Sequence, residues 1–525
     1  MLHDFPFYLI IVIVILLLIM LSNKIKVAYP VLLVLGGLAI SFIPGIPVLR
    51  IDPELIFVIF LPPLLYEAAW SISWKELWRW RRIICSFAFL VVFFTAFSVA
   101  LVANHFIPGF SLALGFLLGG IISPPDAVSA GAILKFVKVP RRMSSILEGE
   151  SLLNDASSLI IFRFALIVVG TGQFIWQDAI ASFGWMLVGG VGIGVGIGFI
   201  VMKIHKYLPT DANTDIVLSI VTPYLIYIAA EEVHSSGVLA VVSGGLLLSH
   251  YRLSFLSSSS RLRGVNVWES FCFVLNGLIF MMIGLDLPEI VSGLGDVSLS
   301  SAIGYGLLIT AVLIVARVLC AFSAVFITLI AKNFIKVADG RYPGLKGPIL
   351  IGWTGMRGVV SLAAALSIPV QLSDGTPFPQ RNLILFITFV VILTTLLLQG
   401  LTLPYLIKKF QMPDPDYTMP HEEIYNQIKR ELVDNALNHL KSTYGSELER
   451  QPVLQQIASK WEDINLNTNN DGILMSDEAK TVYLNLLEHQ RKWLLDKNKE
   501  EILDEEIIRR HLLYLDLEEE KLQFI

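Results

Sequence analysis

The sequence predicts an all-α membrane protein with about thirteen transmembrane helices, followed by a small helical cytoplasmic tail. Of the 525 residues, 55% are hydrophobic and only 16% are charged, and the mean hydropathy is +0.69. In soluble domains about a quarter of the residues are charged. Apolar stretches of about 18 residues, each long enough to cross a bilayer, recur between residues 5 and 409. These observations exclude a soluble enzyme.

The loops between the apolar stretches test the number of spans independently, because Lys and Arg concentrate in cytoplasmic loops. Alternate loops hold 21 Lys and Arg, whereas the opposite set holds only Arg50 and Arg381. This alternation supports thirteen spans, with the N-terminus outside and the C-terminus in the cytoplasm. The expected spans are residues 5–22, 27–43, 54–70, 83–103, 111–134, 146–169, 181–202, 215–232, 236–250, 266–287, 299–331, 348–370 and 382–407.

Charge and periodicity divide the chain into two expected domains. Up to Lys409 there are 26 Lys and Arg against 20 Asp and Glu, and beyond it 13 against 24. The second part has apolar positions three and four apart, for example in residues 422–440, which is typical of amphipathic helices. We therefore expect a transmembrane domain over residues 1–409 and an acidic, mainly helical cytoplasmic domain over residues 410–525.

Two spans contain residues that interrupt a helix. The fifth carries Pro124-Pro125 in mid-membrane, and each proline removes an amide donor and disfavours the helical conformation of the preceding residue. The twelfth carries glycines at 352, 355 and 358, which permit unwinding. Interrupted spans in corresponding positions of two halves are typical of secondary transporters. We therefore expect spans five and twelve to be equivalent broken helices of two inverted repeats.

Six ionisable residues lie well inside the expected spans. Each costs about 2.5–3.5 kcal/mol at the centre of a membrane helix, so all six must be paired, neutralised or hydrated. The charges of three acids and three arginines can cancel, so one interpretation is that these residues form structural ion pairs. We expect Arg317 to be a counter-ion in the core and assign no role to Arg163. The six are Asp126, Glu150, Asp155, Arg163, Arg317 and Arg357.

Span six places four polar side chains on one flank of a helix. Glu150 and Asn154 are four residues apart, and so are Ser151 and Asp155. Oxygen ligands suit a hard cation, and a lone carboxylate beside a water-filled cavity can take a proton instead of that cation. The alternative for Asp155 is a helix–helix hydrogen bond.

Four motifs, in order along residues 5–409, resemble one known family. Residues 149–155, Gly-Glu-Ser-Leu-Leu-Asn-Asp, resemble the Asn-Asp signature of the Na⁺/H⁺ antiporters in the monovalent cation:proton antiporter superfamily, in its NhaP/NHE-like branch. Residues 316–319 and 355–362 resemble two further stretches of these proteins, and residues 125–128 resemble the acidic segment of their crossing helices. The chain reads Pro-Pro-Asp-Ala where many members read Thr-Asp-Pro.

The resemblance implies a secondary antiporter of the bacterial inner membrane that serves pH homeostasis. It would exchange a monovalent cation, Na⁺ first, for H⁺ by alternating access, and it would work as a homodimer. No cofactor and no nucleic acid are implied, because the cation and the proton are cargo. An Asn rather than a second Asp before Asp155 implies, again by family, electroneutral exchange.

The resemblance also implies roles for single residues. Asp155 would bind either the cation or a proton, in competition, and Ser151 and Asp126 would complete the Na⁺ site together with backbone of the broken fifth helix. Asn154 would help to hold the crossing helices. Glu150 would form a structural ion pair with Arg357.

Two other classes stay open on sequence grounds. The broken helices could line the pore of a cation channel, although no repeated filter sequence is present. The acidic tail could make the chain a transporter-like sensor. No catalytic triad or metal-hydrolase cluster favours an enzyme, and no GxxxxGK[ST] motif indicates use of ATP.

Overall fold

A computed structural model describes residues 5–43, 53–134, 137, 139–173, 176–295, 297–331, 333, 344–372, 374–410, 421–467, 477–497 and 505–521. Their regular structure is helical, apart from one isolated antiparallel bridge between Gln371 and Pro377. The chain forms two compact units, Met1–Asp414 and Pro415–Ile525. The expected domain boundary after Lys409 remains a prediction.

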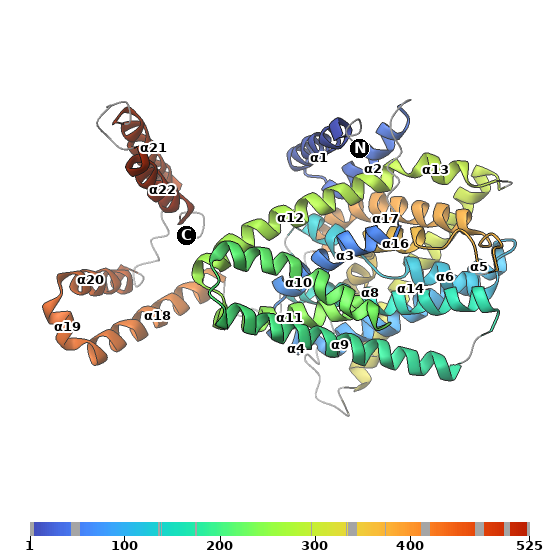
Figure 1. Ribbon diagram of the computed structural model, residues 1–525, viewed down its shortest axis with the longest axis horizontal. Helices are drawn as coiled ribbons and strands as arrows, with labels where there is room; N and C mark the ends of the chain where they lie inside the picture. The colour runs from blue at the N-terminus through green and yellow to red at the C-terminus, as the bar shows by residue number, and fades with distance from the viewer. Residues whose placement is uncertain are drawn as a thin grey trace. The chain divides into compact units, whose positions relative to one another are not determined.

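The described residues of the first unit form seventeen α-helices and one π-helical segment (Figure 1). Several are long and apolar, and two pairs of short helices are separated by only a few non-helical residues. The elements are α1 (Phe5–Ile25), α2 (Tyr29–Ser41), α3 (Pro53–Ser71), α4 (Trp74–Cys85), η1 (Ser86–Val91), α5 (Val92–Phe106), α6 (Leu112–Ile122), α7 (Ala127–Leu134), α8 (Arg141–Thr171), α9 (Trp176–Tyr207), α10 (Ala212–Glu232), α11 (Gly237–Phe255), α12 (Ser258–Leu285), α13 (Leu287–Ser292), α14 (Leu299–Ala331), α15 (Lys346–Trp353), α16 (Val359–Leu366) and α17 (Arg381–Phe410).

The second unit is built from amphipathic helices that pack in two small sets. In the first set Val433, Leu437 and Ala458 form a common core, and in the second Leu487 packs with Leu515. The helices are α18 (His421–Thr443), α19 (Gly445–Arg450), α20 (Pro452–Asn467), α21 (Asp477–Lys497) and α22 (Glu505–Lys521).

Eight helical stretches among the described residues are long and apolar enough to cross a membrane. Helices α1, α2 and α3 have shorter apolar segments, and two more of the expected spans correspond to the broken pairs α6–α7 and α15–α16. The chain is therefore a multi-pass helical membrane protein. The count of thirteen spans and the inverted repeats remain predictions.

Both predicted interruptions are present. Helix α6 ends at Ile122, directly before Ser123-Pro124-Pro125-Asp126, and α7 begins at Ala127. Helix α15 ends at Trp353, and α16 begins at Val359 after five non-helical residues. The two prolines and the glycines thus act as their backbone chemistry predicts.

The helices of the first unit pack as two groups. Helices α4–α8, with η1, pack against one another and against α14–α17; we call this set the crossing group. Helices α1–α3 and α9–α12 form a second set, the outer group. The groups meet mainly where α2, α3 and α11 pack on α8, α16 and α17. In Figure 1 α9 runs along the lower edge of this unit, with α10 and α11 beside it.

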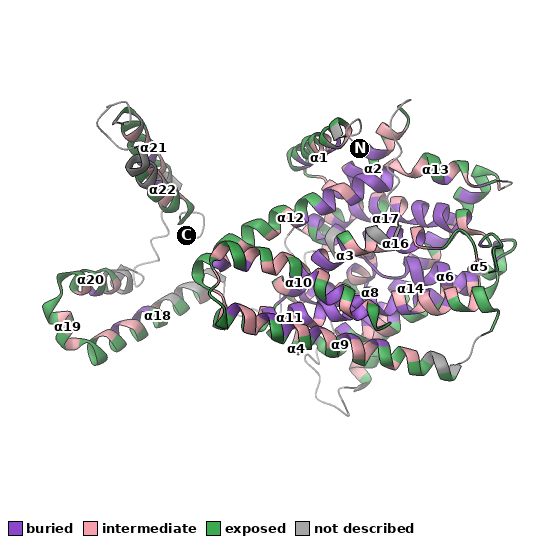
Figure 2. Cartoon of the chain, viewed as in Figure 1, coloured by how far each residue is buried: buried purple, intermediate pink, exposed green. Residues whose placement is uncertain are grey.

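Burial follows this arrangement (Figure 2). In the most apolar window of α17, 78% of the residues are buried, against 22% in α9. Helix α9 instead presents large apolar side chains such as Val188 and Ile200 on the surface. An exposed apolar face of this extent suits a lipid or protein neighbour rather than water.

Candidate functional site

The two helix interruptions cross one another inside the crossing group. The backbone N–H of Asp126 donates to the carbonyl oxygen of Met356 at 2.7 Å, which joins the two non-helical segments directly. The backbone N–H and C=O groups of these non-helical segments have no partners within a helix, and the prolines supply no N–H donors. The contact gives one such N–H and one such C=O a partner. The crossing is buried, with Pro125 and Met356 both in the interior.

Arg357 completes the crossing. Its guanidinium is fully buried and donates to the carbonyl oxygen of Ile122 at 2.6 Å, to that of Ser123 at 3.0 Å and also to that of Gly355. Its own N–H donates to the hydroxyl of Thr395 on α17 at 3.2 Å. The positive charge thus lies at the C-terminal end of α6, where unpaired carbonyls and the helix dipole favour a cation.

Glu150 pairs with Arg317, not with Arg357 as expected. The two guanidinium nitrogens of Arg317 donate to both carboxylate oxygens of Glu150, at 2.7 and 2.9 Å, and both side chains are almost wholly buried. The reason is geometric: the planar fork of Arg317 matches the carboxylate, while the guanidinium of Arg357 is used by carbonyl groups. The pair joins α8 to α14.

Asp155 lies one to two turns further along α8 and has a different environment. Its side chain is buried, with 7% of the residue exposed, and no described residue makes a hydrogen bond or an ion pair with its carboxylate. Asp126 is close enough to interact with it electrostatically. The two carboxylates thus lie near one another beside the crossing, and the described part of the chain gives Asp155 no hydrogen-bond or ion-pair partner.

Asn154 and Ser151 frame Asp155 on the same helix. The amide nitrogen of Asn154 donates to the carbonyl oxygen of Pro125 at 3.2 Å, which ties α8 to the first interruption. The amide oxygen of Asn154 is buried and has no donor among the described residues. Ser151 is half-buried, one turn before Asp155.

Asp126 also starts α7. One of its carboxylate oxygens accepts from the backbone N–H of Ser129 at 3.2 Å and from the Ser129 hydroxyl, as a helix cap does. Gly358 passes so close that a Cβ atom there would lie 2.2 Å from this carboxylate. A side chain at position 358 would displace the carboxylate, so the close approach of the two interruptions needs glycine.

The structure thus brings together three of the predicted site residues, Asp126, Asn154 and Asp155, with Ser151 one turn away. Their oxygen atoms, with carbonyls of the interruptions, are the ligand type that hard monovalent and divalent cations prefer. No group of three or more His, Cys, Asp and Glu side chains in the described part of the chain could hold a resident metal ion. The arrangement suits an exchangeable ion.

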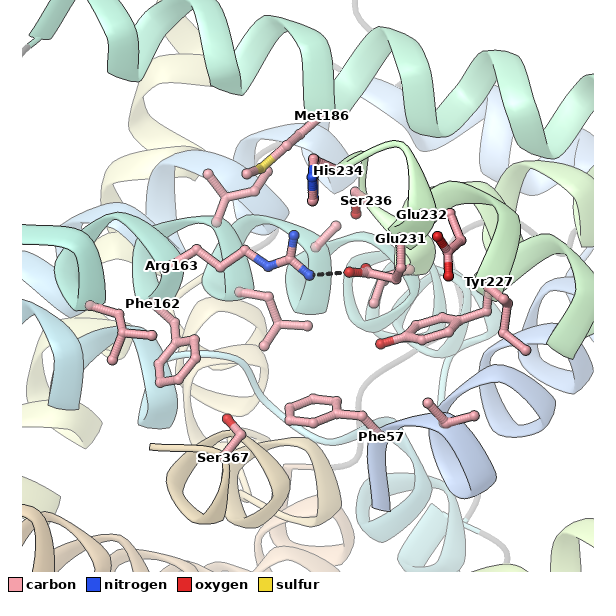
Figure 3. Close-up of a pocket in the computed structure, with 17 residues that line it drawn as sticks. Phe57, Phe162, Arg163, Met186, Tyr227, Glu231, Glu232, His234, Ser236 and Ser367 are labelled. Atoms are coloured by element: carbon pink, nitrogen blue, oxygen red, sulfur yellow. Dashed lines mark hydrogen bonds and ion pairs between the residues drawn. The ribbon is translucent and has the colours of Figure 1, made fainter. Parts of the chain in front are cut away.

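Sequence reasoning missed two contributors to this region, Ser129 and Thr395, and it named Arg163 without giving it a role. Ser129 stands three residues after Asp126, a spacing typical of helix caps that could have identified it. Thr395 gave no signal, because its role depends on how α17 packs. Arg163, which had no assigned role, donates to Glu231 of α10 at 2.6 Å (Figure 3).

Comparison with known proteins identifies the family. The family model described as "Sodium/hydrogen exchanger, transmembrane" matches residues 10–409, which include both interruptions and all of α8. The chain belongs to the sodium/hydrogen exchanger family. This confirms the resemblance that the four motifs indicated.

Individual members of the sodium/hydrogen exchanger family agree with this assignment. The "Sodium, potassium, lithium and rubidium/H(+) antiporter" of Bacillus subtilis is 38% identical over 382 residues, which cover 71% of this chain and 56% of the relative. The chain thus matches little more than half the length of that protein. The "Low-affinity Na(+)/H(+) antiporter NhaS1" of Synechocystis is 30% identical over 466 residues, covering 83% of this chain and 84% of the relative.

A solved exchanger structure has the same fold. The sodium proton antiporter MjNhaP1 of Methanocaldococcus jannaschii, determined at pH 8, superposes with a TM-score of 0.62 at 18% identity. The match covers 78% of this chain and 98% of that chain. At this identity the comparison shows the fold alone.

Proposed function

We propose that this protein exchanges a monovalent cation, Na⁺ first, for H⁺ across the membrane, with Asp155 binding the two in competition. The observation that carries the proposal is the buried carboxylate of Asp155, which has no hydrogen-bond or ion-pair partner among the described residues and lies beside the crossing of two interrupted helices. A buried carboxylate without a counter-ion is costly, so it takes up a proton or a cation. Membership of an exchanger family favours this activity over a channel, a sensor or an enzyme.

The competition follows from the charge and size of the site. When Asp155 is ionised, a cation can bind between it and the oxygens of Ser151 and Asp126, with the free amide oxygen of Asn154 as a further ligand. Protonation removes the negative charge and, with it, most of the attraction for the cation. The release of one ion therefore allows the binding of the other.

The same chemistry makes the exchange electroneutral. With Asp126 keeping the same charge throughout, the Asp155 carboxylate carries one positive charge in either loaded form, so the loaded site has the same net charge with Na⁺ and with H⁺. Transport in both directions then moves no net charge across the membrane. The two packed helix groups are the elements that we propose to move relative to one another in alternating access.

The relatives differ in the cations that their names include. The name of the Bacillus subtilis relative includes four alkali cations, whereas that of the Synechocystis relative includes only Na⁺. We place Na⁺ first and expect Li⁺ to compete, because both are small hard cations that carboxylate and carbonyl oxygens suit.

We further propose a homodimer in the bacterial inner membrane, with the N-terminus outside and the tail cytoplasmic. The orientation rests on the alternation of Lys and Arg between loops. The dimer rests on the family resemblance. Exchange across this membrane would serve pH homeostasis.

The test is dissipation of an imposed pH gradient in proteoliposomes on addition of Na⁺, Li⁺ or K⁺, with and without an imposed membrane potential. We expect exchange in the wild type, no exchange in Asp155→Asn, and no effect of the potential. Asp286→Asn, at the end of α12, is the matched control and should retain exchange. Full activity of Asp155→Asn would refute the shared-carboxylate mechanism, and a response to the potential would refute electroneutrality.

A further inference from the structure

A pocket of about 610 Å³ lies between the crossing group and the outer group. Helix α8 contributes Ala156, Leu159 and Arg163 to its lining, and α10 contributes Tyr227 and Glu231. Figure 3 shows Arg163 and Glu231 reaching toward each other across the pocket from these two helices. The pocket is therefore bounded by both groups and is not internal to either.

The pocket follows α8 toward the ion site. Ala156, Leu159 and Arg163 have the i, i+3, i+7 spacing of one helix face. The rise of 1.5 Å per residue places Arg163 about 10 Å along the axis from Ala156. Because Ala156 directly follows Asp155, the pocket extends from Arg163 to the immediate neighbour of the proposed ion-binding residue.

The Arg163–Glu231 ion pair connects the two helix groups across this pocket. A guanidinium nitrogen of Arg163 lies 2.6 Å from one carboxylate oxygen of Glu231. The other carboxylate oxygen accepts from the backbone N–H of Gly237, at the start of α11, at 3.1 Å. Glu231 is thus fixed within the outer group, and its bond to Arg163 reaches the crossing group.

The charges around the pocket favour a cation because Glu231 balances Arg163. Arg163 alone would repel a cation moving toward Asp155. Glu231 neutralises that charge, and Glu232, which also lines the pocket, leaves the described lining with a net negative charge when His234 is neutral. Both paired side chains are about one-third exposed, so water from the pocket reaches them.

We infer that the Arg163–Glu231 pair is a latch that stabilises the conformation in which this pocket is open, and that the pocket is the cation's route to Asp155 from the face of the membrane that carries His234. This inference rests on the proposed alternating-access function. The distribution of Lys and Arg assigns that face to the outside. A displacement of the crossing group along the outer group that exceeds the reach of these two side chains would break the pair.

Thiol labelling tests the latch without measuring transport. Leu159→Cys, in a background with Cys85, Cys272 and Cys320 replaced by Ala, is labelled from the outside of oriented proteoliposomes with impermeant methanethiosulfonates. One reagent is cationic and the other anionic, because a change in local charge moves their rates in opposite directions, whereas a change in access moves them together. Loss of an ion pair of this exposure should lower both rates by about two- to fivefold.

Three variants sharpen the measurement. Arg163→Gln and Glu231→Gln should both reduce labelling by both reagents, because each removes the latch. Arg163→Lys should retain labelling near the wild-type rate, because one ammonium can replace a single N–H···O contact. Glu232→Gln removes a neighbouring carboxylate that has no ion pair within the described chain. This variant should not lower the cationic and the anionic labelling rates together, because access to the pocket is unchanged.

The apparent KM for the cation provides a second signature. Glu231→Gln leaves an unpaired positive charge on the route and should raise the KM, whereas Arg163→Gln removes that charge and should lower it. A purely structural role would not produce opposite KM shifts together with the same labelling shift. Unchanged or faster labelling in both neutral variants would overturn the latch, and so would Arg163→Lys behaving like Arg163→Gln.

Failure of this inference and failure of the proposed function are distinguishable. If wild-type exchange is present and lost in Asp155→Asn, the antiport mechanism stands whatever the labelling shows. If exchange is absent in the wild type, the pocket can no longer be a transport route, and the inference falls with the proposed function.

Discussion

Glu150 and Asp155 stand five residues apart on α8 and are both buried, yet of the two only Glu150 has a counter-ion among the described residues. Both oxygens of Glu150 accept from Arg317, and this pair joins α8 to α14. Asp155 faces the crossing of the interrupted helices with no described hydrogen-bond or ion-pair partner. A carboxylate with a fixed cation holds the fold together, whereas one without a partner can accept ions from solution.

The same comparison explains why the two arginines are placed as they are. Arg317 neutralises Glu150, and Arg357 neutralises the carbonyl end of α6, so neither compensates Asp155. Removing one member of a buried ion pair lowers the folding stability by much more than the intact pair contributes to it, because the other charge is left buried without a partner. The structural ion pair of Glu150 and the proposed ion-binding carboxylate of Asp155 thus lie less than two turns of helix apart.

The largest expected effect is on stability, from changing each carboxylate to the corresponding amide. Glu150→Gln leaves Arg317 buried without a counter-ion and should cost about 3–5 kcal/mol. Asp155→Asn removes an uncompensated carboxylate and should leave stability unchanged or raise it. Thermal unfolding in detergent, followed as loss of the monodisperse peak, measures both.

The double variant Glu150→Gln/Arg317→Gln is the control for this contrast. It should be less destabilised than the sum of the single changes, because the charges are removed together. Equal destabilisation by Glu150→Gln and Asp155→Asn would mean that both carboxylates are structural.

A smaller effect is expected at the closest approach of the two interruptions. In Gly358→Ala the new Cβ would meet the Asp126 carboxylate, and overpacking of this kind costs about 1–3 kcal/mol. The loss of exchange activity should exceed what the loss of stability explains, because Asp126 faces the proposed ion site. Gly304→Ala on α14, where a Cβ meets nothing within 4 Å, should change neither quantity. Parallel exchange assays and thermal unfolding make the comparison, and normal exchange in Gly358→Ala would exclude a tight crossing.

The smallest effect should come from the cap on α7. Ser129→Ala removes the hydroxyl that donates to Asp126 but keeps the backbone N–H contact. One hydrogen bond is worth about 1 kcal/mol, which corresponds to about a fivefold change in apparent cation affinity. Ser98→Ala, whose hydroxyl bonds within its own helix on an exposed face, should not alter this affinity. An unchanged KM in Ser129→Ala would place Asp126 outside the ion site.

Much of the fold could be predicted from the sequence, because the signals were local. The prolines at 124–125 and the glycines at 355–358 disfavour a helix where they stand, and the apolar windows reflect the thickness of the bilayer. These residues do not always end a helix, because α3 continues through Pro62-Pro63 and α9 through the glycines between 189 and 198. The helical spacing of Ser151, Asn154 and Asp155 likewise places them along α8 without any tertiary information.

The pairing of charges could not be predicted, because it depends on which helices become neighbours. Glu150 and Arg317 are separated by 167 residues, and nothing local distinguishes Arg317 from Arg357 as a partner. The Arg163–Glu231 contact spans 68 residues and two helix groups, and Glu231 resembled any acid at the end of a span. Periodicity gives the face of a helix but not the helix that it meets.

The most direct test of the central claim is proton release on cation binding. Purified protein in weakly buffered detergent solution receives Na⁺ at a pH where the unloaded site is protonated, and the released protons are measured with a dye. We predict release of about one proton per chain, saturating with Na⁺, and none from Asp155→Asn. Equal, saturable release from Asp155→Asn would contradict the account, because the cation and the proton would then exchange at another group.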